Sequence, residues 1–101
     1  MKPVRLSALA QDELREAFQH LEQNAGPDIA DRFILSVNTT LEAVADRPES
    51  FVVVHAEAMI RRAITHRFPY GVFFQVEDHE IRVIAVTHLH RHPDTWKRRT
   101  G

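Results

Sequence analysis

Three histidines, His88, His90 and His92, alternate in the last part of the chain. An extended backbone points alternate side chains to one side, so all three imidazoles would share a face. Three such rings can ligate zinc, and a single imidazole can act as an acid or base because it titrates near neutrality. Neighbouring strand residues leave little room for a tetrahedral site, and Pro93 should bend the chain there. We therefore predict no bound metal and no other cofactor.

The charge of the chain is divided unevenly. Residues 1–59 contain 5 Lys and Arg against 10 Asp and Glu, whereas residues 60–101 contain 8 against 4, together with 5 of the 7 histidines. A basic C-terminal part suggests an acidic partner, either a nucleic acid or the acidic tail of a protein. Taken alone, the split favours a plainer interpretation, namely helices with solvated acidic faces beside a sheet with basic edges.

Length and composition are those of one small globular domain. The 101 residues suffice for one core, so we expect residues 1–101 to form a single domain. There is no cysteine, which excludes disulfides and thiolate metal sites. No apolar run approaches the roughly 18 residues of a membrane span, and the N-terminus lacks the pattern of a signal peptide. These features predict a cytoplasmic protein with no membrane partner.

A short strand and a helix are expected first. Residues 3–6 predict the strand, and Ser7 can then cap a helix by accepting the N–H bonds that its first turn leaves unpaired. Apolar residues recur at helical spacing to about residue 24. Three carboxylates fall off this stripe and predict a solvated face rather than a catalytic pair: Asp12, Glu13 and Glu16.

A second helix should follow at once. Gly26 suits the end of one helix and Pro27 the first turn of the next, which then runs to Arg47 before Pro48 stops it. Two amphipathic helices joined so closely should pack as an antiparallel hairpin. Residues 49–59 show no sustained period and are expected to form a loop.

The last third of the chain is rich in strand-forming residues. Residues 59–66, 70–77 and 80–88 predict three strands, the last two joined by a turn at Asp78 and His79. Helices grouped before strands indicate an α+β fold. We therefore predict an N-terminal strand and an antiparallel helical hairpin packed on a mainly antiparallel β-sheet.

Apolar residues occupy both faces of the expected sheet, so the helices should cover one side and something else the other. In the first strand of the hairpin, one face would hold Tyr70, Val72, Phe74 and Val76. In the second strand, Ile84 and Val86 would share one face, and the other would hold Ile81, Val83 and Ala85. The expected core also includes Phe33, Ile34 and Phe73.

Trp96 lies within a basic segment, residues 91–99. We expect its indole to pack back on the sheet and pin the terminus, which would orient the neighbouring cations. Arg67, just before the sequence Phe-Pro-Tyr, is expected either to pair with an acidic helix residue or to contact a target.

Three segments together resemble the ParE/RelE toxins, or plasmid-stabilisation proteins. They are residues 10–14 with Ala17, residues 62–64 followed by 67–72, and residues 81–86 followed by His88, Arg91, Pro93 and Trp96. The set spans nearly the whole chain in the family's order. The resemblance implies the toxin of a type II toxin–antitoxin system, which a cognate antitoxin neutralises within a hetero-oligomer.

Antitoxins of this family carry a flexible segment that wraps the toxin. An exposed edge strand and the partly apolar outer face of the sheet would receive it, unless a homodimer buries the same surface. If the isolated protein were a monomer with that side already sealed by its own residues, the toxin–antitoxin account would not survive. The residues expected to bind the antitoxin or the target are Arg67, Tyr70, His88, Arg91, Trp96 and Arg98.

The family divides by target. RelE-like members are ribosome-dependent mRNA endonucleases, whereas ParE-like members inhibit DNA gyrase and have no known hydrolytic chemistry. Metal-free RNA cleavage requires a base, an acid and cations that stabilise phosphate charge. As a nuclease, this chain would draw these groups from Arg62, Arg67, Arg82, His88 and His90, with His92 as a further acid or base.

Other residues that a RelE-like nuclease would use are missing from this sequence. Tyr70 is the only tyrosine, and there is no lysine between Lys2 and Lys97. An isoelectric point near 6.6 suits a ribosome or RNA surface poorly. We therefore favour a gyrase inhibitor without enzymatic activity. The alternatives are a ribosome-dependent mRNA endonuclease and a non-toxic homologue that acts as a protein-binding module.

Overall fold

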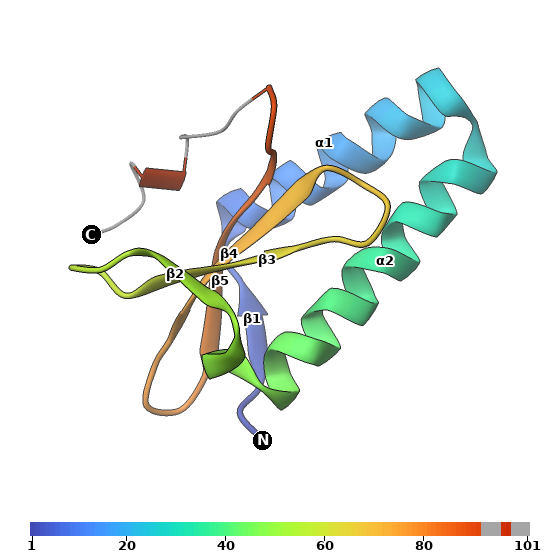
Figure 1. The fold of residues 1–101 in the computed structure, drawn as a ribbon. Coiled ribbons are helices and arrows are strands. Elements are labelled where there is room, and N and C mark those ends of the chain that lie inside the picture. Colours follow the sequence, from blue (N-terminus) through green and yellow to red (C-terminus); the bar gives the residue numbers. More distant parts are fainter. Residues whose placement is uncertain (92–95, 98–101) are drawn as a thin grey trace.

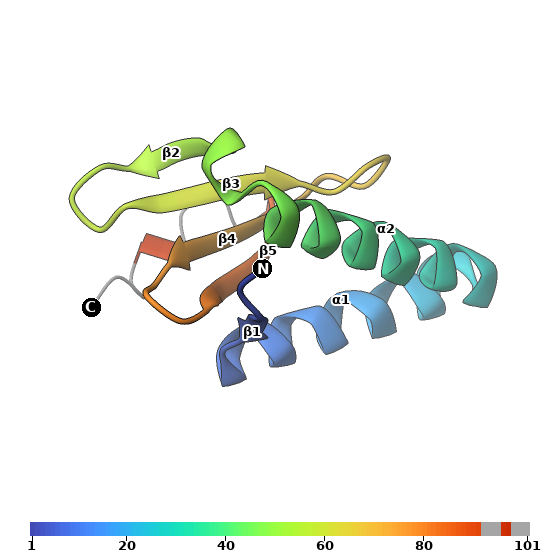
Figure 2. The same cartoon turned by 90° about the horizontal axis from the view of Figure 1, so that it is seen from below.

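The structure is a computed structural model that describes residues 1–91 and 96–97. Two helices cover one face of a five-stranded sheet with the order β1-β5-β4-β3-β2 (Figures 1 and 2). Strand β1 is parallel to β5, and the other neighbours are antiparallel. The predicted α+β fold is thereby confirmed.

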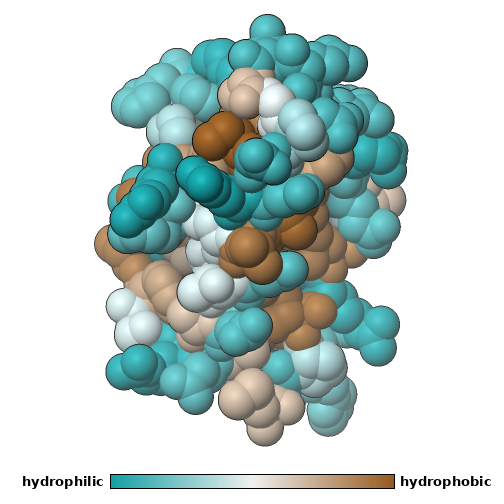
Figure 3. Space-filling view, turned by 90° about the vertical axis from the view of Figure 1, so that its right-hand side faces the viewer, coloured by the Kyte–Doolittle hydropathy of each residue, from teal (hydrophilic) through white to brown (hydrophobic). Residues whose placement is uncertain are grey.

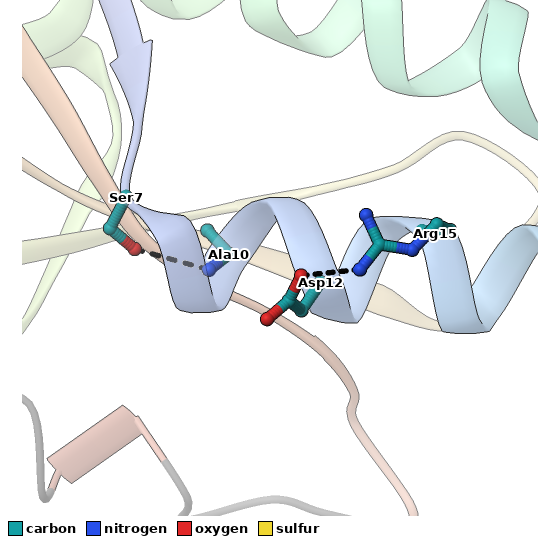
Figure 4. Close-up of polar contacts among 4 residues, drawn as sticks. All are labelled: Ser7, Ala10, Asp12 and Arg15. Atoms are coloured by element: carbon teal, nitrogen blue, oxygen red, sulfur yellow. Dashed lines mark hydrogen bonds and ion pairs between the residues drawn. The ribbon is translucent and has the colours of Figure 1, made fainter.

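Strand β1 (Val4–Leu6) leads directly into helix α1 (Ala8–Ala25). As predicted, Ser7 caps the helix: its Oγ accepts a hydrogen bond of 3.1 Å from the backbone N–H of Ala10 (Figure 4). One turn further on, Asp12 pairs with Arg15 on the exposed side of the helix. The cap satisfies one of the N–H groups that a helix leaves unpaired at its start.

Helix α2 (Pro27–Asp46) returns antiparallel to α1, because Gly26 adopts a φ of 95° that separates the two helices. Its buried stripe faces the sheet and consists of Ala30, Phe33, Val37, Thr40 and Val44. The hairpin is confirmed, and Phe33 contacts Tyr70 on the sheet with ring centroids 4.8 Å apart.

The prediction of a loop over residues 49–59 was wrong. This stretch contains the end of a short 3-10 helix η1 (Pro48–Ser50) and strand β2 (Val52–His55), which pairs with β3 (Ile60–Ile64). Strand β2 is short, lies at the sheet edge and changes register between Val53 and His55. An edge strand with a register shift buries neither face regularly, so it leaves no two-residue period in the sequence.

Strands β4 (Tyr70–Val76) and β5 (Ile81–His88) form the predicted hairpin. The backbone N–H of Glu77 donates to the carbonyl of Glu80 at 2.8 Å, which closes the turn around Asp78 and His79. On β4 the predicted face is confirmed, because Tyr70, Val72 and Phe74 belong to the core beneath the helices and Val76 packs against it.

The predicted faces of β5 were wrong. A register shift between Phe73 and Phe74 pairs Phe73 with Ala85 but Phe74 with Val83. Ile84 is therefore an extra residue, and the alternation of inward and outward side chains reverses there. As a result the core under the helices receives Ile81, Val83 and Val86, whereas the opposite, outer face of the sheet carries Ile84 and Ala85.

Candidate functional site

Arg91 joins the end of the sheet to helix α1. Its Nη2 donates to the hydroxyl of Tyr70 at 3.2 Å, and its Nη1 lies 3.2 Å from Nε2 of His20. A guanidinium has donors only, so Nε2 of His20 must be the acceptor. Tyr70 is buried on β4 against Phe33, which gives the guanidinium a rigid anchor.

His88 closes the turn that presents Arg91. Its Nδ1 accepts backbone N–H bonds from His90 and Arg91, each at 3.1 Å, and its ring packs edge-on against Tyr70 at 5.1 Å. In this arrangement His88 therefore shapes the turn. We call Tyr70, His88, Arg91 and His20 the Arg91 cluster.

Three of the six residues predicted to bind a target or antitoxin thus meet in one place, namely Tyr70, His88 and Arg91. His20 joins them from α1 and was not predicted, since it is 71 residues from Arg91 in the chain. Arg91 is exposed, so its remaining donors face solvent. The Arg91 cluster holds the positively charged guanidinium of Arg91 in a fixed position. Such a group is suited to bind a carboxylate or a phosphate.

Glu13 also has a role that its helical position did not reveal. Its Oε1 accepts a 3.0 Å hydrogen bond from the backbone N–H of Val86. The bulge at Ile84 shifts the pairing of β5 next to this N–H, and the carboxylate supplies an acceptor there. The prediction that Glu13 lies on a solvated face was therefore wrong, whereas Asp12 and Glu16 are exposed as expected.

Trp96 packs on the outer face of the sheet, as predicted. It is 5% exposed and stacks on Phe73, with ring centroids 4.9 Å apart and an interplanar angle of 14°. Together with Ile60, Ile84 and Ala85 these rings form a second, smaller core. The expectation that this face is open for a partner was therefore wrong at its centre, because the chain covers it with its own indole.

Two predicted phosphate-binding arginines lie on this same outer face. Arg62 precedes the inward-facing Ala63, and Arg82 lies between the inward-facing Ile81 and Val83, so both point away from the helices. Arg82 is exposed, whereas Nε of Arg62 is buried without a hydrogen-bond partner among the described residues.

Arg67 occupies the turn between β3 and β4, in the left-handed backbone region with a φ of 68°. Its Nε donates to Nε2 of His66 at 3.3 Å. Within residues 1–91 and 96–97 no acidic helix residue pairs with it, so the predicted ion pair is not found there. Arg67 is exposed and remains available for an external acidic group.

The predicted nuclease residues do not converge on one place. Arg62 and Arg82 lie on the outer face, and Arg67 lies in the β3–β4 turn. His88, at the end of β5 beside Tyr70, does meet His90, with ring centroids 5.7 Å apart. His92 and Arg98 lie outside the described residues. In the part of the chain that is described, no three His, Asp or Glu side chains are grouped so that they could hold a metal ion.

Comparison with known proteins gives the class of the fold. A solved structure of a "Chromosomal ParDE TA system from P. aeruginosa" aligns with a TM-score of 0.67 and 17% sequence identity, and covers 87% of this chain and 96% of that chain. No curated protein matches the chain. Among the described residues, neither helix has the length and apolarity needed to cross a bilayer. The chain therefore shares the fold of that structure.

The family follows from the sequence match. A family model described as "ParE toxin of type II toxin-antitoxin system, parDE" matches residues 4–93, nearly the whole chain. The chain belongs to this family of ParE toxins.

Proposed function

We propose that this chain inhibits DNA gyrase in the cytoplasm and is kept silent by a cognate antitoxin, without cleaving RNA. The observation that carries the proposal is the dispersal of the nuclease candidates over both faces of the sheet. General acid–base cleavage needs an acid, a base and cations around the same phosphate. The outer-face arginines and His88 lie on opposite faces of the sheet, so they cannot surround one phosphate.

The Arg91 cluster supports a binding role instead. His88 and Tyr70 already serve as acceptors within the cluster, and together they orient one exposed guanidinium. A fixed guanidinium is suited to pair with a carboxylate or phosphate of a partner, because little side-chain entropy is lost on binding. We propose that Arg91 contacts gyrase directly.

The test measures the effect of the purified toxin on two processes, DNA supercoiling by gyrase and the integrity of mRNA during translation. We expect the toxin to inhibit DNA supercoiling by gyrase and to leave mRNA intact in a translation reaction. The R91A variant should need about tenfold more protein for the same inhibition, a size typical of losing a central charged contact. The control is R47A, since Arg47 is exposed and its only ion pair among the described residues is with its neighbour Asp46. This variant should match the wild type.

Two other outcomes would overturn the proposal. Cleaved message with unaffected gyrase would replace this proposal by the ribosome-dependent endonuclease. If neither activity appears and overexpression leaves growth unchanged, the chain is a non-toxic homologue that acts as a protein-binding module. Growth arrest that is relieved by co-expressing the product of the adjacent small reading frame would support the antitoxin part of the proposal.

A further inference from the structure

His20 lies exposed on helix α1, close to its C-terminal end. Its Nε2 is 3.2 Å from Nη1 of Arg91, although the two residues are 71 positions apart in the chain. A guanidinium offers donors only, so this hydrogen bond exists only while Nε2 has a free lone pair. His20 therefore supplies the Arg91 cluster with an acceptor from the helical layer.

Arg91 is thus held at two points. Its Nη2 donates to the hydroxyl of Tyr70 on β4 at 3.2 Å, and its Nη1 meets His20 on α1. With the Tyr70 anchor alone, the guanidinium could rotate about a single hydrogen bond. The second anchor fixes its plane, and with it the direction of the donors that remain for a partner. An arginine ordered in this way loses less side-chain entropy when it binds.

Asn24 lies beside the imidazole, one turn further along α1. Its Nδ2 donates to the backbone carbonyl of His20 at 2.8 Å and lies 3.3 Å from Nδ1 of the ring. A neutral imidazole has one acceptor nitrogen, and Arg91 uses it, so Nδ1 carries the hydrogen. The approach of Asn24 to Nδ1 is then a contact between amide and ring and not a hydrogen bond. The only acceptor of the ring is therefore committed to Arg91.

We propose that His20 is a positioning residue, whose neutral imidazole fixes the guanidinium of Arg91 for the contact with gyrase and whose protonation releases it. The inference rests on the proposed contact between Arg91 and gyrase, and it adds what sets the strength of that contact. In a protonated imidazole both nitrogens are donors, so no acceptor remains for Arg91. The ring would also place a second positive charge beside the guanidinium. The contact should therefore weaken as the pH falls through the range in which imidazoles titrate.

The charges that border His20 on the two helices do not pair with it. Glu16 lies one turn earlier on α1 and is exposed. The first turns of α2, which packs against α1, carry three exposed charged residues: Asp28, Asp31 and Arg32. Among the described residues no ion pair joins any of these to His20. Figure 3 faces the side at which α1 ends and α2 begins, and hydrophilic residues dominate its upper part, so a polar contact suits this region.

The sheet presents a second imidazole, that of His88. Its Nδ1 accepts the backbone N–H of Arg91 at 3.1 Å, and the ring of His90 packs against it with centroids 5.7 Å apart. A change in the charge of either ring would act on the turn that carries Arg91 and not on the guanidinium itself. The test must therefore separate His20 from these two histidines.

The first measurement is the dissociation constant of the purified toxin with gyrase at a pH of about 8. Because both side chains are exposed and water competes for them, we expect H20A to weaken binding by about two- to tenfold, as the loss of one hydrogen bond does. The double variant H20A/R91A should bind no more weakly than R91A, since His20 acts only through Arg91. The matched control is H79A, because His79 is exposed at the opposite end of the β4–β5 hairpin from the cluster.

The second measurement repeats this binding at a pH of about 5.5, where imidazoles are largely protonated. At each pH the affinity is expressed relative to R91A, so that changes in gyrase itself cancel. The advantage of the wild type over R91A should shrink by the factor that H20A loses at the higher pH. In H20Q a side-chain carbonyl replaces the imidazole acceptor and does not titrate, so its advantage over R91A should stay within about twofold between the two values of pH.

Three results would overturn the inference. The first is an H20A protein that binds as tightly as the wild type, and the second is a pair of effects that add in H20A/R91A. The third is an H20Q protein that loses its advantage at low pH as the wild type does, which would assign the pH dependence to His88 or His90. Unchanged circular dichroism and melting temperature would establish that the variants are folded.

A measurement on the toxin alone separates this inference from the proposed function. If the wild type does not bind gyrase at all, the proposed function fails, but the guanidinium signals of Arg91 in nuclear magnetic resonance still report whether it is held. At a pH of about 7.5 we expect these signals to be resolved in the wild type and in H20Q, and averaged by rotation in H20A. Identical Arg91 signals in the wild type and H20A would overturn the positioning role, whatever the target of the toxin is.

Discussion

The hydrogen bond from Val86 to Glu13 predicts a clear loss of stability in E13A. Val86 is buried, and its N–H donates to the carboxylate at 3.0 Å beside the bulge of β5. Removing the acceptor leaves this N–H unsatisfied, which costs about 1–3 kcal/mol of the free energy of unfolding. For a domain of this size, about 1 kcal/mol corresponds to a fall in melting temperature of about 4–8 °C.

The assay is urea and thermal denaturation of E13A, E13Q and E16A, with amide hydrogen exchange at Val86. E13Q retains a neutral acceptor and should lose less than E13A, because a bond to a charged group is the stronger one. Glu16 is exposed on the same helix, so E16A controls for the change in helix propensity and should remain within about 0.5 kcal/mol of wild type. An E13A protein as stable as E16A, with Val86 exchange unchanged, would refute the reasoning.

Two further predictions concern the outer face of the sheet. W96A removes an indole that is 5% exposed and stacked on Phe73. We expect this variant to lose about 3–5 kcal/mol of unfolding free energy and to bind a hydrophobic dye that the wild type does not bind. A melting curve that matches the wild type would mean that the indole does not contribute to this core. In G71A the new Cβ would lie 2.8 Å from both Cδ2 of Leu89 and Cε1 of Phe73, which predicts a loss of about 1–3 kcal/mol. That loss should shrink when G71A is combined with L89A, and strictly additive effects in calorimetry would argue against the clash.

Local sequence patterns were enough to predict those elements that depend on only a few neighbouring residues. Ser7 before an apolar stripe predicted the start of α1, and Gly26 followed by Pro27 predicted the break between the helices. Alternation on β4 identified its buried face, and an isolated tryptophan beside an apolar sheet was expected to pack on it. The family resemblance, carried by the order of three segments, agrees with the match over residues 4–93.

Contacts between distant parts of the chain decided the rest. The extra residue at Ile84 reverses the faces of β5 because a bulge depends on the pairing with β4, which no periodicity within β5 reveals. Strand β2 exists because β3 offers it a partner, although its own sequence lacks a period. Only folding brings Glu13 to Val86 and His20 to Arg91, and only the sheet's two faces separate Arg62 from His88. Tyr70, His88 and Arg91 were therefore identified from the sequence, whereas the part of His20 and the grouping of all four residues depended on long-range packing.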